Sequence, residues 1–382
     1  MALDAETRQQ LLDSISRFVR ERLRPLEDKV AEDDAVPDAI VQEMRELGLF
    51  GLAIPEEYGG LGLSMEDECL AMFEMGRTSP AFRSVFGTNV GIGSQGIVMF
   101  GTGEQKREWL PGLASGEIIA SFALTEPGAG SDAGSVRTSA VRDGDDYVIN
   151  GTKRYITNAN KANVFTLMAR TDAAVKGAKG VSSFIVPSDL PGISLGKPEK
   201  KMGQQGAHIC DINFDNVRVP ARLRLGEEGM GFINAMKILE RGRLHISAVC
   251  VGVAERLIAD CVAYASEREQ FGQAIGQFQL IQAMLADSKT EAYAGRCMVL
   301  DAARRRDAGE EIGTEASCSK YFCSEMVGRV ADRAVQIYGG AGYVTDYGIE
   351  RLYRDVRIFR LYEGTSQIQQ IVIARSMLKD AS

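Results

Sequence analysis

The spacing of apolar residues changes twice along the chain and divides it into three stretches. Up to about residue 120 apolar residues recur every three or four positions, which is typical of amphipathic helices. The first of these helices is expected to end at Pro25. Asp38 is expected to cap the second, which Gly48 terminates, and Ser64 with Asp67 predicts a capping box for another.

From residue 121 to 231 the apolar residues alternate with polar ones, as they do in β-strands. Asp143-Gly144 and Asn150-Gly151 are typical hairpin turns and flank the alternating segment 147–149. Further strands are expected at 164–168, 181–186 and 212–219.

From residue 232 the helical period returns and holds to the end. Long helices are expected at 248–268, 280–308 and 315–338, and Gly339-Gly340 ends the last. The order predicts a mainly α protein with a central β domain. Its parts would be an N-terminal helical domain at 1–120, a middle β domain at 121–231 and a C-terminal helical domain at 232–382.

Composition narrows the classes of function. The 382 residues carry a net charge of −8 and 25% charged residues, which is ordinary for a globular protein and disfavours nucleic-acid binding. No run approaches the ~20 apolar residues that cross a membrane, and the first residues do not resemble a signal segment. The seven scattered cysteines are expected to be buried thiols in a reducing cytoplasm. Because the chain has only two histidines, a metal site is not expected. Catalysis is instead expected to rely on carboxylates or a cofactor.

Two segments near the β domain are candidates for binding a ligand. Thr125-Glu-Pro-Gly-Ala-Gly-Ser-Asp132 exposes backbone N–H groups and the Ser131 hydroxyl to an anion or a flat ring, although a tight loop at a domain boundary has the same composition. Tyr155 and Thr157 share one face of a strand, where they would contact either a flavin or the core and solvent.

Two further segments end long helices. In Glu267-Arg-Glu-Gln-Phe-Gly272, Arg268 suits a phosphate and Phe271 suits a base, although a charged helix end followed by a turn explains the same residues. Gln336-Ile-Tyr-Gly-Gly-Ala-Gly342 is either a helix C-cap or a loop against a nucleotide.

The segment Tyr362-Glu-Gly-Thr-Ser-Gln-Ile-Gln369 holds a candidate catalytic group. Glu363 follows the apolar stretch 358–361 and precedes the start of a helix. An apolar pocket raises the pKa of a carboxyl and suits it to act as a general base. The alternative is a residue of the first helical turn, stabilised by the helix dipole.

Taken together, these segments resemble the acyl-CoA dehydrogenase family over nearly the whole chain. The family's order and spacing are followed by TEPGAGSD, YITN, Lys201-Met-Gly203, Phe214…Val219-Pro220, ERxxFG, QIYGGAG and YEGTSQIQ. The resemblance implies an N-terminal helical domain, a middle β-barrel domain and a C-terminal four-helix bundle. It also implies a homotetramer that binds FAD between the β domain and the C-terminal helices.

The resemblance also assigns residues to FAD. The flavin side would be contacted by Phe122, Leu124, Thr125, Ser131, Tyr155, Ile156, Thr157, Thr365 and Gln367. The ADP part would be contacted from a neighbouring subunit by Arg268, Gln270, Phe271, Phe278, Gln279, Gln336, Ile337, Gly339 and Gly340.

The reaction implied by the resemblance is α,β-dehydrogenation of an acyl-CoA to the trans-2-enoyl-CoA. Glu363 would remove the α-proton while a hydride passes from the β-carbon to the flavin. The Glu363 N–H and a ribityl hydroxyl of FAD would stabilise charge on the thioester oxygen. Positions that contact the acyl-CoA in the family are matched by Ser131, Glu240, Arg243 and Gly364. One branch of the family places its base just before that arginine. Here Gly242 stands there, so Glu363 is the expected base.

The segment Pro80-Ala-Phe-Arg-Ser84 bears on the substrate. It resembles the segment by which glutaryl-CoA dehydrogenases hold the distal carboxylate, with Arg83 and Ser84 in the matching places. A buried arginine requires an anion, so this points to a short dicarboxylyl-CoA, from glutaryl to pimeloyl. An exposed Arg83 paired with an acidic residue would instead leave a short-chain, medium-chain or branched-chain acyl-CoA as substrate. His245 would face the same pocket or be a core histidine.

Two rival functions share these motifs. An acyl-CoA oxidase would pass electrons to oxygen, and a non-catalytic protein would keep only the fold. The length of 382 residues leaves no room for the further domain of long-chain oxidases, and Glu363 with the FAD motifs argues against a non-catalytic protein. The resemblance implies an electron-transferring flavoprotein as acceptor, and we expect a cytoplasmic location.

Overall fold

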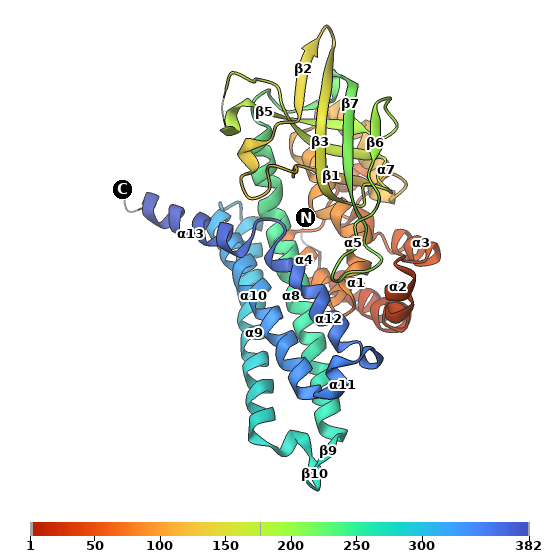
Figure 1. Ribbon diagram of the computed structural model, residues 1–382, viewed down its shortest axis with the longest axis vertical. Coiled ribbons are helices and arrows are strands. Elements are labelled where there is room, and N and C mark those ends of the chain that lie inside the picture. Colours follow the sequence, from red (N-terminus) through yellow and green to blue (C-terminus); the bar gives the residue numbers. More distant parts are fainter. Residues whose placement is uncertain (1–2, 176, 381–382) are drawn as a thin grey trace.

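The computed structural model describes residues 3–175 and 177–380 and places helices on both sides of a β domain (Figure 1). The N-terminal helices are α1 (Ala5–Phe18), α2 (Glu27–Asp33), α3 (Asp38–Glu46), α4 (Met65–Met75), α5 (Pro80–Thr88), α6 (Gln95–Phe100) and α7 (Gly103–Ser115). Pro25 does not end the first helical segment, contrary to expectation. It lies in the first turn of a 3₁₀ helix, Arg24–Leu26, where its missing N–H is not needed and the chain continues into α2.

The predicted helix caps agree in part with the structure. Ser64 caps α4, because its Oγ accepts from the Asp67 N–H at 3.1 Å, but the predicted capping box is only half formed: the Asp67 carboxylate accepts from the Ser64 hydroxyl at 2.7 Å in place of its backbone N–H. Gly48, with φ +70°, ends α3. Asp38, however, is the first residue of α3 and not its cap. Pro37 occupies the cap position, which has no side-chain hydrogen bond.

The β domain is one sheet with the strand order β6-β7-β3-β2-β4-β5-β8, and β1 pairs in parallel with β4. Its strands are β1 (Ala120–Ala123), β2 (Ser139–Asp143), β3 (Asp146–Thr157), β4 (Val164–Arg170), β5 (Val181–Pro187), β6 (Ile193–Leu195), β7 (Ile209–Pro220) and β8 (Arg224–Leu225). Asp143-Gly144 lies at the β2–β3 turn as predicted. Asn150-Gly151 is not a turn: it lies inside β3 at a register shift, where Asn150 Oδ1 accepts from the Asn216 N–H at 2.8 Å.

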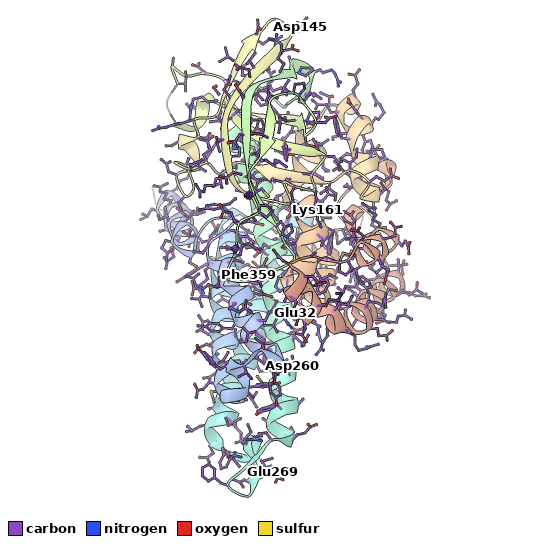
Figure 2. The ribbon with its side chains drawn as sticks, turned by 45° about the vertical axis from the view of Figure 1, so that its right-hand side comes forward. Glu32, Asp145, Lys161, Asp260, Glu269 and Phe359 are labelled. Carbon is purple, nitrogen blue, oxygen red and sulfur yellow. The ribbon has the colours of Figure 1, made fainter. Side chains whose placement is uncertain are left out.

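The C-terminal part is built on three long helices that run side by side away from the β domain (Figure 1). They are α8 (Gly231–Glu267), α9 (Gln279–Asp307) and α10 (Gly313–Tyr338). A small hairpin of β9 (Glu269–Gln270) and β10 (Gln273–Ala274) joins α8 to α9. The chain ends with α11 (Gly340–Tyr343), α12 (Ile349–Val356) and α13 (Ser366–Asp380). In Figure 2, Asp145 at the tip of the β2–β3 hairpin and Glu269 of β9 mark opposite ends of the molecule.

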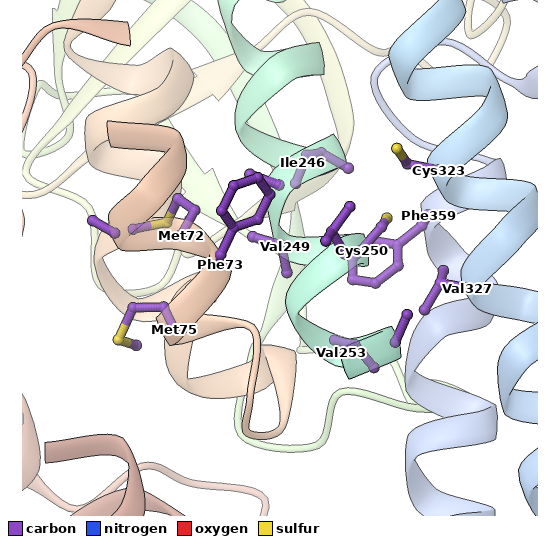
Figure 3. Close-up of a cluster of buried hydrophobic side chains, with 14 of the residues drawn as sticks. Met72, Phe73, Met75, Ile246, Val249, Cys250, Val253, Cys323, Val327 and Phe359 are labelled. Carbon is purple, nitrogen blue, oxygen red and sulfur yellow. The ribbon is translucent and has the colours of Figure 1, made fainter. Parts of the chain in front are cut away.

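A shared core ties the N-terminal helices to the C-terminal ones. Figure 3 shows Phe73 of α4, Val249 of α8 and Val327 of α10 in one buried cluster. This packing fixes α4 against α8, along which the charged residues described below lie. The cysteines are all free. Five are buried as expected, but Cys318 is half-buried and Cys297 is exposed. Within the described ranges, no helix is long and apolar enough to cross a bilayer.

Candidate active site

Glu363 lies on a short segment, residues 361–365, that precedes α13 and is called the strap below. Its φ of +53° is left-handed, which is unusual for a residue with a side chain and typical of functional sites. The strap is tied down through its carbonyl groups. Gln369 Nε2 donates to the oxygens of Glu363 and Gly364 at 3.1 Å each, and Lys320 Nζ donates to the Gly364 oxygen at 2.7 Å. Since α13 begins at Ser366, Glu363 is not a residue of its first turn.

The Glu363 carboxylate faces the middle of α8. Its Oε2 is buried and has no hydrogen-bond partner among the described residues. A Cβ placed on Gly242 would lie only 2.4 Å from that oxygen. Glycine at position 242 therefore leaves the room that the Glu363 carboxylate occupies, so the two positions at which a base was expected from the sequence lie next to each other.

Charged groups from three helices tune this carboxylate. Burial raises the pKa of Glu363, while the positive charges of Arg83, Lys320 and Arg243 oppose that rise. The pKa remains above its ordinary value, which suits a group that must accept a proton near neutral pH. Arg83 comes from α5, Arg243 from α8 and Lys320 from α10.

Sequence reasoning missed Lys320. Burial lowers the pKa of its ammonium to about 8, yet Nζ still donates to the strap. The only signal was a lysine placed between buried residues of α10, such as Ser317 and Cys323, where a surface lysine would not fit.

We expect Lys320→Met to move the acid limb of the pH–rate profile toward higher pH, by roughly one unit. The Lys320 charge favours ionised Glu363 and lowers its pKa, so removing that charge raises the pKa of the base and slows the reaction at low pH. The measurement is kcat against pH, with Lys29→Met, an exposed lysine paired with Asp33, as control. An acid limb that stays in place would contradict this role.

Arg83 is buried, with 5% of its surface exposed, so the alternative of an exposed Arg83 is wrong. Within the part of the chain that the structure describes, no carboxylate lies within 4.0 Å of its guanidinium, and its Nε donates to His245 Nε2 at 2.9 Å. The side chain passes over Gly87, where a Cβ would lie 2.3 Å from Arg83 Nε. Ser84 is also buried, and its hydroxyl donates to the Pro80 oxygen at 3.1 Å.

Two of the residues predicted to contact acyl-CoA, Arg243 and Glu240, are positioned by a hydrogen bond and an ion pair. Arg243 is buried, which lowers the pKa of its guanidinium, and its Nη1 donates to Ser317 Oγ at 3.3 Å. Burial raises the pKa of Glu240, which pairs with Arg306 at 3.5 Å. Ser131 lies exposed on the glycine-rich loop.

A buried ion pair anchors the glycine-rich loop. Lys153 Nζ donates to Glu126 Oε1 at 2.7 Å and to the Leu124 oxygen at 2.9 Å, and the Glu126 carboxylate also accepts from two backbone N–H groups. Gly128 and Gly130 of the loop border open space, with nothing within 4 Å of a built Cβ. The loop is therefore held rigidly and can be approached closely.

The other predicted flavin contacts lie on β1, on β3 or next to the start of α13. Ile156 is buried, and Tyr155 is half exposed with φ +58°. The remaining ones lie at the end of β1, at the end of β3 and at the start of α13: Phe122, Leu124, Thr125, Thr157, Thr365 and Gln367.

The predicted ADP contacts lie elsewhere. The β9–β10 hairpin and its flanks carry Arg268, Gln270, Phe271, Phe278 and Gln279, at the end of α8 far from the β domain (Figure 1). The end of α10 carries Gln336, Ile337, Gly339 and Gly340, and Tyr338 there stacks on Tyr264 of α8 with 4.0 Å between ring centroids. Phe271 is 95% exposed. A single chain thus leaves the two sets at opposite ends of the helices.

This fold is that of a flavin-dependent oxidoreductase. Family models described as the N-terminal, middle and C-terminal domains of acyl-CoA dehydrogenase match residues 5–117, 121–217 and 229–378. The chain therefore belongs to the acyl-CoA dehydrogenase family, whose members depend on FAD.

Two relatives and two solved structures illustrate the range of the family. A 3-(aryl)acrylate reductase of Clostridium sporogenes is 42% identical over 97% of this chain and 98% of its own length. The caffeyl-CoA reductase–Etf complex subunit CarC of Acetobacterium woodii is 41% identical, covering 92% and 93%. The butyryl-CoA dehydrogenase of Megasphaera elsdenii superimposes with a TM-score of 0.95 at 34% identity, covering 99% and 100%. A glutaryl-coenzyme A dehydrogenase in complex with glutaryl-CoA has a TM-score of 0.93 at 33% identity, covering 99% and 96%.

Proposed function

We propose that the protein is an acyl-CoA dehydrogenase that oxidises a short dicarboxylyl-CoA, from glutaryl to pimeloyl, to the trans-2-enoyl-CoA. The observation that carries the substrate class is the buried Arg83: Glu363 faces its guanidinium, but no carboxylate of the described residues forms a direct ion pair with it. A buried cation without a directly bound anion is costly, and a carboxylate at the far end of the acyl chain would supply one.

Glu363 is the proposed base. Its unpartnered Oε2 takes the α-proton of the acyl group, and its raised pKa matches that task. The tied strap presents the Glu363 N–H as one donor to the thioester oxygen. Bound FAD supplies the acceptor for the hydride that leaves the β-carbon. Ser131, Glu240, Arg243 and Gly364 hold the CoA thioester.

The FAD contacts proposed from the sequence are supported by geometry. The open glycines of the anchored loop and the exposed Tyr155 suit a flat ring, and the exposed Arg268 and Phe271 suit a phosphate and a base. Because these two sets lie at opposite ends of the helices, we propose that FAD is shared between subunits of a homotetramer. The name of the CarC relative supports an electron-transferring flavoprotein as redox partner. We also propose a cytoplasmic location.

A second candidate function is the reverse reaction. The 42% identical relative is named a reductase of 3-(aryl)acrylates, and the same base and flavin can return a proton and a hydride to an enoyl-CoA. An unsubstituted short-chain, medium-chain or branched acyl-CoA is the alternative substrate for the oxidative direction.

Initial rates with an artificial electron acceptor test the proposal. We expect kcat/KM to be highest for one of glutaryl-, adipoyl- and pimeloyl-CoA, and at least about tenfold lower for butyryl- and hexanoyl-CoA. The same enzyme with photoreduced flavin and the matching enoyl-CoA reports the reverse direction. Equal kcat/KM values for acyl-CoA substrates with and without the distal carboxylate would contradict the proposed substrate class.

A further inference from the structure

Behind Arg83 lies a row of buried polar side chains from three helices. Arg83 Nε donates to His245 Nε2, and His245 Nδ1 lies 2.7 Å from Glu68 Oε1. The second oxygen of Glu68 accepts from Arg241. Arg83 comes from α5, Glu68 from α4, and His245 and Arg241 from α8. None of the four is more than 8% exposed.

These contacts fix the tautomer of His245. An arginine Nε can only donate, so His245 Nε2 accepts and the ring proton sits on Nδ1, facing Glu68. Burial and the charge of Arg83 lower the pKa of His245 to about 4, so its ring is neutral near pH 7. Burial disfavours ionised Glu68, but Arg241 and the His245 hydrogen bond outweigh it and lower the pKa of Glu68.

The charges along this row do not cancel. Glu68 is negative, His245 is neutral, and Arg83 and Arg241 are both positive. Arg306 also faces Glu68, but it has its own partner in Glu240 at 3.5 Å. Since Arg241 holds the second oxygen of Glu68 directly, the positive charge that remains within the row lies at its Arg83 end, which Glu363 faces without forming a direct ion pair.

The hydrogen bonds of Arg83 leave the two terminal nitrogens of its guanidinium available for a ligand. Its Nε donates to His245, and the one other hydrogen bond that it makes within residues 3–175 and 177–380, from Nη2 to the Gly87 oxygen, is 3.5 Å long. The two terminal nitrogens of a guanidinium match the two oxygens of a carboxylate. Gly91 also lies near this group, since a Cβ placed on it would be in ordinary van der Waals contact with Arg83 Nη2, at 3.6 Å.

We infer that His245 is a positioning residue that aims the Arg83 guanidinium at the distal carboxylate of the acyl group, and that Glu68 with Arg241 holds His245 in the tautomer that this requires. The inference rests on the proposed function. Selectivity for a carboxylated acyl chain then depends on all four residues of the row and not on Arg83 alone.

Two substitutions of His245 separate its contacts. In His245→Gln, the amide reaches as far as Nε2 and offers an oxygen to Arg83. In His245→Asn, the shorter amide takes the place of Nδ1, so the hydrogen bond with Arg83 is lost. With adipoyl-CoA we expect His245→Asn to raise KM about tenfold or more, the loss of one hydrogen bond to a charged group, and His245→Gln to retain most of the wild-type KM. With hexanoyl-CoA both variants should stay within about twofold, because no carboxylate is bound there.

His208→Asn is the matched control, since His208 contacts Asp34 and Asn160 away from this row. It also assigns the spectrum for a second measurement. The chain has two histidines, so ¹⁵N NMR of histidine-labelled enzyme loaded with FAD shows two rings, and the one that persists in His208→Asn is His245. We expect a neutral ring with its proton on Nδ1 from about pH 6 to about pH 8.

The outcomes distinguish this inference from the proposed function. A wild-type enzyme without preference for adipoyl-CoA over hexanoyl-CoA overturns both. If Arg83→Ala removes the preference but His245→Asn retains it, the role of His245 is overturned and the proposed function stands. A ring proton on Nε2, or a ring that titrates between about pH 6 and about pH 8, overturns the inference even if the His245 variants do not fold.

Discussion

Glu363→Gln is expected to slow reduction of the bound flavin by acyl-CoA by about 10³-fold or more. Glutamine has nearly the same shape but cannot take the α-proton. The strap should keep its conformation, because Lys320 and Gln369 hold it through main-chain oxygens and not through the carboxylate. The variant should therefore remain yellow and bind acyl-CoA.

Stopped-flow absorbance under anaerobic conditions measures this rate, and the spectral change on adding ligand measures binding. A glutamine variant that reduces its flavin within about tenfold of the wild-type rate would exclude Glu363 as the base. A colourless variant would instead show that the substitution disturbs the FAD site, and Glu363→Asp, which keeps a carboxylate, would then serve to test the base.

Arg83→Ala should remove the preference for carboxylated substrates. Loss of one partner of a buried, hydrogen-bonded charge pair costs about 2–5 kcal/mol, so kcat/KM for adipoyl-CoA should fall at least about 30-fold. With hexanoyl-CoA the change should be small or an increase, because a buried charge without a partner is removed. The two substrates are compared at the pH plateau of each variant, since the Arg83 charge also lowers the pKa of Glu363.

Arg83→Lys is the matched control for charge. Lysine keeps the positive charge but lacks the fork and the Nε that donates to His245, so an intermediate loss with adipoyl-CoA is expected. Arg218→Ala, an exposed arginine of the β domain that pairs with Asp143 and Asp146, controls for general effects. An equal loss on both substrates in Arg83→Ala would make Arg83 structural.

Much of the fold could be predicted because its signals are local. The helix expected at 315–338 is α10, Gly313–Tyr338, and the one expected at 280–308 is α9, Gln279–Asp307. The return of the helical period at residue 232 matches the start of α8 at Gly231, but the long helix was expected only from residue 248, because the charged run Glu240-Arg241-Gly242-Arg243 breaks its apolar pattern. Only partners from distant helices make burial of these charges possible. Similarly, pairing of β3 with β7 overrides the turn signal of Asn150-Gly151.

The candidate site could be predicted where a motif carried it. Glu363 and Arg83 were found from their segments, and the structure brings them together on α5 and the strap. Lys320 was not found, and of the row behind Arg83 only His245 was singled out, as a residue of the same pocket or of the core, because the roles of these residues depend on contacts between distant parts of the chain. Lys320 meets Gly364 across 44 positions, and His245 meets Glu68 across 177. The sequence of a helix does not show which residue of another helix will pair with a buried charge, because that depends on how the helices pack.

The most direct test of the central claim is anaerobic bleaching of the bound flavin by adipoyl-CoA and by hexanoyl-CoA at equal concentration. The two acyl chains have the same length and differ by the distal carboxylate, so the comparison isolates the group that Arg83 is proposed to bind. Faster bleaching by adipoyl-CoA is the predicted result. Bleaching that is equal, or faster with hexanoyl-CoA, would contradict the claim and leave a dehydrogenase of unsubstituted acyl chains.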